Sequence, residues 1–166
     1  RSLYKPQSGY RYFSSVPEWR EEVAKEDRIV GIAESVMQGD EVFQFTMTDV
    51  VEAFKEYFGR TGTTPGSYDY FVLHQAQKLI VDNLAVFWDI PLDKLLSSYK
   101  DFGNTSVASI PLTLCWNKDA FSDGQPKNVF MSGFGIGLSY GVVSAAIDSS
   151  VLGDIVYSDD YYKEWR

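Results

Sequence analysis

The hydrophobic positions between residues 36 and 148 follow two alternating spacings, one typical of helices and one typical of strands. Residues 41–45 form a short β-prone run. Thr46 follows, with Asp49 three positions later, a pattern that can open a helix. Behind Thr46 the apolar side chains recur every three or four positions, which predicts a helix with one buried face: Met47, Val50, Val51, Phe54, Tyr57 and Phe58.

The same alternation continues along the chain. A turn-rich segment at 62–67 precedes an aromatic and β-branched run at 68–73, which predicts a strand. A helix is expected at about 75–88, and it is expected to bury one side: Leu79, Ile80, Leu84 and Phe87. The later elements expected are a helical turn at 91–97, a helix at about 105–116, and buried strands at 128–132 and 141–147. Strands that alternate with helices predict an α/β fold built in layers.

The two ends of the chain carry weaker patterns. Pro17, followed by Glu18, Trp19, Val23 and Ala24, suits a short helix opened by proline. Residues 28–33 fit either a strand or part of a helix, and residues 149–166 are acidic and aromatic without a clear period. We therefore expect three zones: an N-terminal segment at 1–35, a domain at 36–148 and a C-terminal extension at 149–166.

The composition is that of an ordinary globular domain, with 45% hydrophobic and 23% charged residues among 166. No apolar run is long enough to span a membrane, and the first residues lack the apolar core of a signal peptide. The net charge of −8 disfavours binding to nucleic acid, where lysine and arginine must neutralise phosphates. A cytoplasmic location is expected. The chain begins without Met, which fits an internal piece of a longer protein.

One cysteine and one histidine limit the chemistry. They cannot form an internal disulfide, a cysteine-rich zinc site or a metal cluster, so we expect neither metal nor cofactor. Cys115 lies within a predicted helix and has no evident charged partner, which favours an inert thiol. The chain also lacks the G-x-S-x-G elbow of a serine hydrolase.

His74 stands where a predicted strand passes into a helix, the place where layered α/β domains gather their sites. The positive end of the following helix would disfavour protonation of the imidazole. A neutral imidazole can donate one hydrogen bond to a developing oxyanion. The alternative is a structural histidine whose nitrogens are satisfied by backbone groups, and position alone leaves both interpretations open.

Asn104 follows Gly103, which permits a sharp backbone path, and precedes Thr105 and Ser106. Because asparagine, threonine and serine all cap helices well, a capping role is the simpler interpretation. The functional interpretation requires the carboxamide to point, together with His74, at one substrate oxygen.

Four glycines, Gly133, Gly135, Gly137 and Gly141, invite comparison with a dinucleotide-binding loop. Their spacing is not G-x-G-x-x-G, and the residues that follow predict a strand instead of a helix. A tight turn that lines a pocket fits better, because the missing side chains make room.

Four segments, taken in order, resemble a single family. Residues 37–43 (MQGDEVF) are similar to its M-x-G-x-E-V-F entry, and residues 71–77 (FVLHQAQ) to its strand followed by His-Gln-Ala-Asn. Residues 99–111 (YKDFGNTSVASIP) are similar to its Gly-Asn-Thr-Ser segment, and residues 133–141 to its closing glycine-rich loop. The chain therefore resembles the C-terminal half of β-ketoacyl-acyl carrier protein synthase III.

The resemblance implies a thiolase-like half, a mixed β-sheet packed against α-helices, in an enzyme that joins an acyl thioester to a malonyl thioester by decarboxylative Claisen condensation. It implies catalytic roles for His74 and Asn104 as hydrogen-bond donors to the malonyl thioester oxygen. It also implies substrate-binding roles for five positions: Gln75, Gln77, Gly103, Gly135 and Gly137. The implied substrates are coenzyme A or acyl carrier protein thioesters.

Two positions depart from the family pattern. Gln77 replaces the asparagine of His-Gln-Ala-Asn, and Leu79 stands where the family often has an arginine used to dock the carrier protein. The cysteine nucleophile, which belongs to the family's N-terminal half, has no counterpart here. The resemblance thus implies a partner half, either in the same polypeptide or in a separate one, and a homodimer for the full-length protein. Two alternatives remain: acyl transfer to an alcohol or amine by a divergent member, and a non-catalytic partner subunit.

Overall fold

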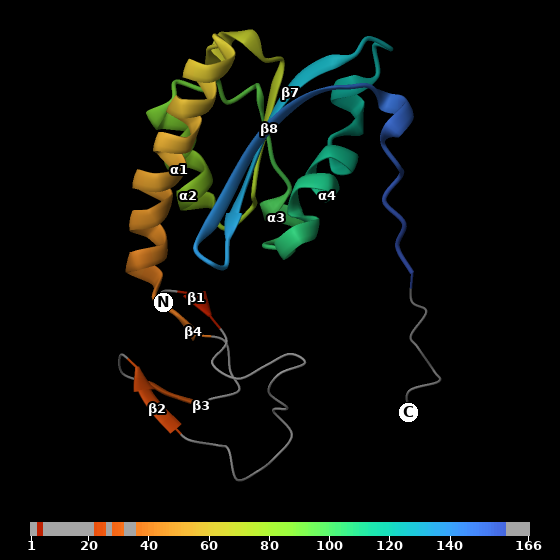
Figure 1. Cartoon of the computed structure of the whole chain (residues 1–166). Helices are drawn as coiled ribbons and strands as arrows, with labels where there is room; N and C mark the ends of the chain where they lie inside the picture. Colours follow the sequence, from red (N-terminus) through yellow and green to blue (C-terminus); the bar gives the residue numbers. More distant parts are fainter. Residues whose placement is uncertain (1–2, 5–21, 26–27, 32–35, 159–166) are drawn as a thin grey trace. The chain divides into compact units, whose positions relative to one another are not determined.

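The computed structural model describes residues 3–4, 22–25, 28–31 and 36–158. The chain divides into two compact units. The first comprises Arg1–Gly62 and Gly133–Val142, and the second comprises Thr63–Ser132 and Val143–Arg166. Figure 1 labels the main helices and strands along the chain.

In the first unit the N-terminal strands form two antiparallel pairs: β1 (Leu3–Tyr4) with β4 (Val36–Met37), and β2 (Glu22–Lys25) with β3 (Arg28–Gly31). The helix predicted from Pro17 is wrong at Val23 and Ala24, which lie in β2, and its first residues lie outside the described residues. Pairing with β3 gives this backbone hydrogen-bond partners, whereas so short a helix is only marginally stable by itself. The strand alternative for residues 28–33 is confirmed over Arg28–Gly31.

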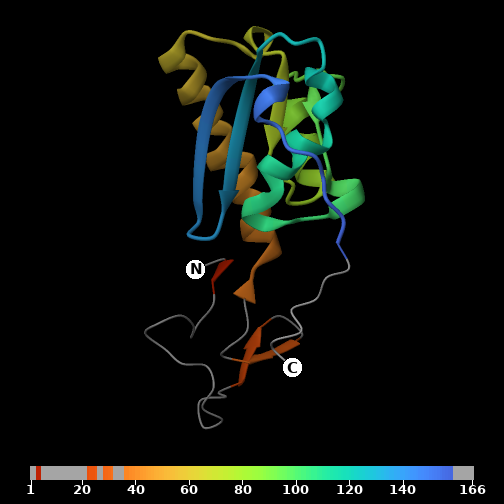
Figure 2. The same cartoon turned by 90° about the vertical axis from the view of Figure 1, so that its right-hand side faces the viewer.

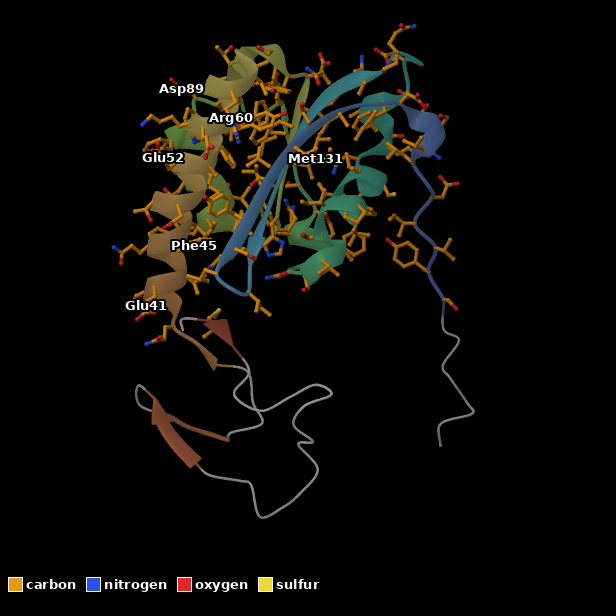
Figure 3. All side chains as sticks on the ribbon, viewed as in Figure 1. Glu41, Phe45, Glu52, Arg60, Asp89 and Met131 are labelled. Atoms are coloured by element: carbon orange, nitrogen blue, oxygen red, sulfur yellow. The ribbon has the colours of Figure 1, made fainter. Side chains whose placement is uncertain are left out.

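The helix α1 (Gly39–Thr61) is the longest element of the first unit. Asp40 and Glu41 lie in its first turn, where negative charge favours the positive end of the helix dipole. Gly62 ends the helix with a φ of +67°, a left-handed conformation that favours glycine. Figure 3 labels Glu41, Phe45, Glu52 and Arg60 along this helix.

The structure corrects the predicted start of this helix. Residues 41–45, predicted as a β-prone run, lie in its first two turns, and Thr46, expected to open it, is buried inside it. The Thr46 hydroxyl donates to the carbonyl of Phe43 at 2.7 Å, so it is satisfied without capping the helix. The rings of Phe45 and Tyr140 lie 6.2 Å apart, a tertiary contact that the local pattern could not reveal.

A mixed sheet has the strand order β6-β5-β7-β8, and its residues outside Gly133–Val142 belong to the second unit. Its strands are β5 (Tyr70–Leu73), β6 (Leu95–Leu96), β7 (Lys127–Gly135) and β8 (Ser139–Ile147). The strand β5 pairs in parallel with β6 and with β7, where Leu73 lies opposite Ser132. β7 and β8 are joined by a three-residue turn, so the glycine-rich link is shorter than predicted. The prediction that the second strand is buried is wrong, because every residue of β8 is exposed or half-buried.

Helices cover both faces of this sheet, with α2 (Lys78–Phe87) on one face and α3 (Tyr99–Phe102) and α4 (Ser109–Trp116) on the other (Figures 1 and 2). The residues of β5 alternate between the two faces, as in any strand. The buried core on the α4 side comprises Val72, Leu96, Leu114, Phe121, Val129 and Leu152. The layered α/β prediction is thus confirmed.

The predicted helix at 75–88 is confirmed as α2, but its buried face is displaced. Its core residues are Ile80, Val81, Leu84 and Ala85. Leu79 and Phe87, predicted to be buried, are 59% and 61% exposed. The helix begins only at Lys78. Which of its faces meets the sheet depends on where the chain leaves β5, and the spacing of apolar residues alone does not specify this.

The predicted helical turn at 91–97 is wrong over its second half, because Leu95 and Leu96 pair with β5 as the edge strand β6. The predicted helix at 105–116 is confirmed as a 3₁₀ turn (Ser106–Ala108) that continues into α4. Among the residues that the structure describes, no helix is both long and apolar enough to cross a membrane.

We expect Phe121→Ala to lower the free energy of unfolding by about 3–5 kcal/mol, because it removes a fully buried ring from the core. The ring of Phe121 lies 5.4 Å from that of Tyr70. The matched control is Phe87→Ala, which removes an exposed ring and should change stability by less than about 0.5 kcal/mol. Urea unfolding followed by circular dichroism measures both. Equal losses in the two variants would contradict the position of this core.

Candidate active site

His74 directly follows β5, and its backbone N–H donates to the carbonyl of Ser132 at 2.8 Å, which continues the pairing with β7. Its side chain is half-buried, and Nδ1 lies 2.7 Å from the hydroxyl oxygen of Ser109 on α4. The histidine therefore stands at the C-terminal end of a central strand, as the sequence predicts.

Burial lowers the pKa of His74, because the partly desolvated site disfavours the charged imidazolium. The sequence attributed a neutral imidazole to the positive end of the following helix. The structure corrects this cause, since α2 begins four residues later, at Lys78. The expected neutral form thus has a different physical origin.

Gln75 is fully buried, and both ends of its side chain are hydrogen-bonded. Nε2 donates to the carbonyl of Leu73 at 2.6 Å, while Oε1 accepts from the backbone N–H groups of Ser98 at 2.9 Å and Tyr99 at 3.2 Å. A buried amide left unpaired costs about 1–3 kcal/mol, so these partners fix the residue in place. Gln75 therefore joins the end of β5 to the start of α3, which leads to Gly103 and Asn104.

Gly103 ends α3 with a φ of +65° and a ψ of −152°, a conformation open to glycine and strained for other residues. The sharp path predicted for this position is confirmed. Asn104 follows in an exposed position, and its Oδ1 accepts a hydrogen bond from the N–H of Ser106 at 2.8 Å.

This contact is a local turn and not the helix cap of the simpler interpretation, because the residue that caps the 3₁₀ turn is Thr105, which makes no side-chain capping bond. It engages the carbonyl oxygen of the carboxamide and leaves Nδ2 as the donor. Among the residues that the structure describes, Asn104 has no other hydrogen bond. The turn contact and donation to a substrate thus use different atoms of the Asn104 side chain, so the functional interpretation stays a prediction.

The structure ties His74 to the segment that bears Asn104 through Ser109, a residue that the sequence analysis missed. Ser109 lies five positions after Asn104 and contacts His74, so the 104–109 segment is tied to the end of β5. Hydroxyl residues on a short apolar helix were the available signal, but a contact between positions 35 apart cannot be deduced from a pattern.

Gln77, Gly135 and Gly137 are the other positions that the sequence predicts to bind substrate. Gln77 is exposed, and its carbonyl accepts the N–H groups of Ile80 and Val81 at the start of α2. Gly135 ends β7, and Gly137 lies in the turn before β8, with a φ of +139°. A Cβ on Gly137 would approach the backbone nitrogen of Ser139 to 3.1 Å, so this turn requires glycine. Both glycines belong to the first unit, and His74, Gln75, Gln77, Gly103 and Asn104 to the second.

Cys115 lies on α4 and is half-buried, so it does not stand at a strand-to-helix elbow. Within the described part of the chain, no group of histidine, cysteine, aspartate or glutamate side chains is arranged to hold a metal ion. The hydrogen-bonding groups of this site include the imidazole of His74 and Nδ2 of Asn104.

Residues 58–147 match the family described as "3-Oxoacyl-[acyl-carrier-protein (ACP)] synthase III C terminal". A β-ketoacyl-[acyl-carrier-protein] synthase III of Synechococcus sp. (strain RCC307) is 40% identical over 114 residues, which cover 67% of this chain and 33% of the relative. The chain therefore spans about a third of the length of this relative.

Two solved structures are similar over most of the chain. A 3-oxoacyl-(acyl-carrier protein) synthase from Burkholderia xenovorans LB400 is 28% identical, with a TM-score of 0.74 over 92% of this chain and 42% of that chain. The priming β-ketosynthase from the R1128 polyketide biosynthetic pathway is 31% identical, with a TM-score of 0.68 over 89% of this chain and 41% of that chain. These likenesses confirm both the fold class and the resemblance found in the sequence.

The lowered pKa of His74 predicts a pH dependence of stability. The folded state binds fewer protons than the unfolded state once the pH falls below the ordinary histidine value of about 6.5, so the free energy of unfolding should decrease as the pH falls. We expect part of the loss between about pH 7.5 and 5.5 to disappear in His74→Gln, which cannot titrate. Urea unfolding of both proteins at the two pH values measures this, and identical losses would contradict the assignment.

Proposed function

Because the chain belongs to the family of 3-oxoacyl-[acyl-carrier-protein] synthase III C-terminal domains, we propose that it supplies two catalytic residues, His74 and Asn104, to a decarboxylative condensing enzyme. The proposed reaction joins an acyl thioester to a malonyl thioester, as in fatty acid or polyketide synthesis. The observation that carries the proposal is a partly buried imidazole with a lowered pKa, tied to the segment that bears Asn104.

The chemistry requires a stabilised enolate. When the malonyl thioester loses carbon dioxide, the bond between its carboxylate and its α-carbon breaks, and the electron pair passes into an enolate whose charge lies on the thioester oxygen. Neutral donors fixed beforehand around that oxygen stabilise the charge without reorganising. Nδ2 of Asn104 and one imidazole nitrogen of His74 are donors of this kind.

The second half of the reaction forms the carbon–carbon bond. The enolate carbon attacks the carbonyl of an acyl group held as a thioester on a cysteine, and the cysteine thiolate leaves. Cys115 is the single cysteine of this sequence and lies on α4. We therefore assign the nucleophile to an N-terminal half, supplied by the same polypeptide or by a separate one. The full-length enzyme is proposed to be a cytoplasmic homodimer that needs no cofactor.

The remaining residues support this centre in the proposal. Gln75 holds the end of β5 against the start of α3, and Gly103 turns the chain so that Asn104 follows. Gln77, Gly135 and Gly137 are proposed to line the path of the substrate. The substrate carrier is either coenzyme A or an acyl carrier protein.

One surface observation favours a second candidate, acyl transfer to an alcohol or amine. Lys78 is engaged by Asp82 in an ion pair, and its neighbour Leu79 is exposed where the family often places a docking arginine. With a net charge of −8, this surface offers little attraction to an acidic carrier protein. A divergent member with another acyl acceptor would fit such a surface, as would a non-catalytic subunit.

We expect His74→Ala and Asn104→Ala each to lower the rate of malonyl decarboxylation by about a hundred- to a thousand-fold, because each removes one donor to the enolate oxygen. The assay is release of carbon dioxide from a malonyl thioester by the assembled enzyme, with the cysteine-bearing half present. Asn128→Ala is the matched control, since Asn128 lies at the start of β7, at the opposite end of the sheet from His74.

The outcomes separate the candidates. Condensation at the wild-type rate in either alanine variant would remove that residue from the mechanism. Acyl transfer to an alcohol or amine without release of carbon dioxide would replace the condensation proposal with the second candidate. A coding sequence that lacks any cysteine-bearing half, together with absence of both activities, would indicate a non-catalytic subunit.

A further inference from the structure

The hydroxyl of Ser109 is hydrogen-bonded to the imidazole of His74. Ser109 is 1% exposed, and its oxygen lies 2.7 Å from Nδ1 of His74. Among the residues that the structure describes, this hydroxyl has no second hydrogen-bond partner. Nδ1 of His74 is therefore the acceptor available to the hydroxyl proton of Ser109.

Two arrangements of protons are possible across this contact. If Nδ1 carried a proton and donated it to Ser109, the O–H of Ser109 would be a buried donor without an acceptor, which costs as much as a broken hydrogen bond. If Ser109 donates to an unprotonated Nδ1, its proton is used and only the lone pairs of its oxygen stay unpaired. The second arrangement is the more stable one.

We infer that Ser109 is a positioning residue that donates its hydroxyl proton to Nδ1 of His74 and thereby holds the neutral imidazole in the tautomer with its proton on Nε2. The contact fixes the ring orientation as well as the tautomer, because rotation of the ring would break it.

The position of Ser109 is itself fixed by buried polar groups. The hydroxyl of Thr113 donates to the carbonyl of Ser109 at 2.7 Å. Because Thr113 has one hydroxyl proton, Ser98 must be the donor in the 2.7 Å contact between the hydroxyls of Ser98 and Thr113. The backbone N–H of Ser98 in turn donates to Oε1 of Gln75, the residue next to His74. These hydrogen bonds, together with the peptide bond between His74 and Gln75, close a ring of contacts.

The tautomer decides what the imidazole offers to a substrate, a consequence that rests on the proposed function. A proton on Nε2 makes that nitrogen a donor to a developing oxyanion, whereas the other tautomer would present a lone pair that repels it. Ser109 would then act on the reaction through His74, without contact with the substrate.

The test uses the fact that the sequence contains one histidine, so the imidazole ¹⁵N resonances belong to His74 alone. In the unaltered chain at about pH 7.5, above the histidine pKa, we expect a protonated Nε2 and an unprotonated Nδ1 that accepts a hydrogen bond. A proton on Nδ1, or an even mixture of tautomers, would overturn the inference. This measurement needs no variant, so it decides even where a substitution prevents folding.

Variants then test the hydroxyl itself. In Ser109→Ala we expect the preference for the Nε2 tautomer to fall by up to about tenfold, and the pKa of His74 to rise, because a hydrogen bond to the neutral ring is lost. Ser109→Thr keeps the hydroxyl and should restore both values. Ser97→Ala removes a neighbouring hydroxyl outside the ring of bonds and should change neither. An unaltered tautomer ratio in Ser109→Ala would overturn the assignment.

The spectroscopic result and the activity are separable. An enzyme that shows the Nε2 tautomer yet releases no carbon dioxide contradicts the proposed function and leaves the inference standing. An active enzyme whose histidine carries its proton on Nδ1 contradicts the inference and leaves the proposed function standing.

Discussion

The candidate site depends on a single buried carboxamide. Gln75 lies at the end of a central parallel strand, where its side chain cannot reach water and must find its partners within the protein. Three backbone groups provide them, one on β5 and two at the start of α3. The loop that carries Gly103 and Asn104 is thus held by the same residue that follows the histidine.

Local signals predicted the larger elements because each is specified by residues close together in the sequence. The strand β5, the helices α2 and α4 and the positive φ of Gly103 follow from periodicity and from the special freedom of glycine. The start of α1 was predicted wrongly, because the β-prone residues 41–45 are overridden by the long helix to which they belong. The buried face of α2 was wrong at Leu79 and Phe87, because tertiary packing determines which side meets the sheet.

Some site residues can likewise be predicted from the sequence, and others cannot. His74 and Asn104 stand out by residue type and by their places at element ends, and the family resemblance strengthens both. Ser109, Thr113 and Ser98 do not stand out, since serine and threonine near a helix start are usually caps. Ser109 bonds to His74, 35 positions away, and Thr113 to Ser98, 15 positions away, and such pairs become neighbours only after the sheet and α4 have packed.

The parallel pairing of β5 with β7 has a consequence for how this chain can diverge. Parallel neighbours need a crossover, and here the crossover contains α2, β6, α3 and α4 together with His74, Gln75, Asn104 and Ser109. The polar side chains that the second unit contributes to the site thus all belong to one connection between two adjacent strands. Selection could reshape that connection in length and side chains while the strand register stayed intact, so one sheet could present different side chains at the end of β5.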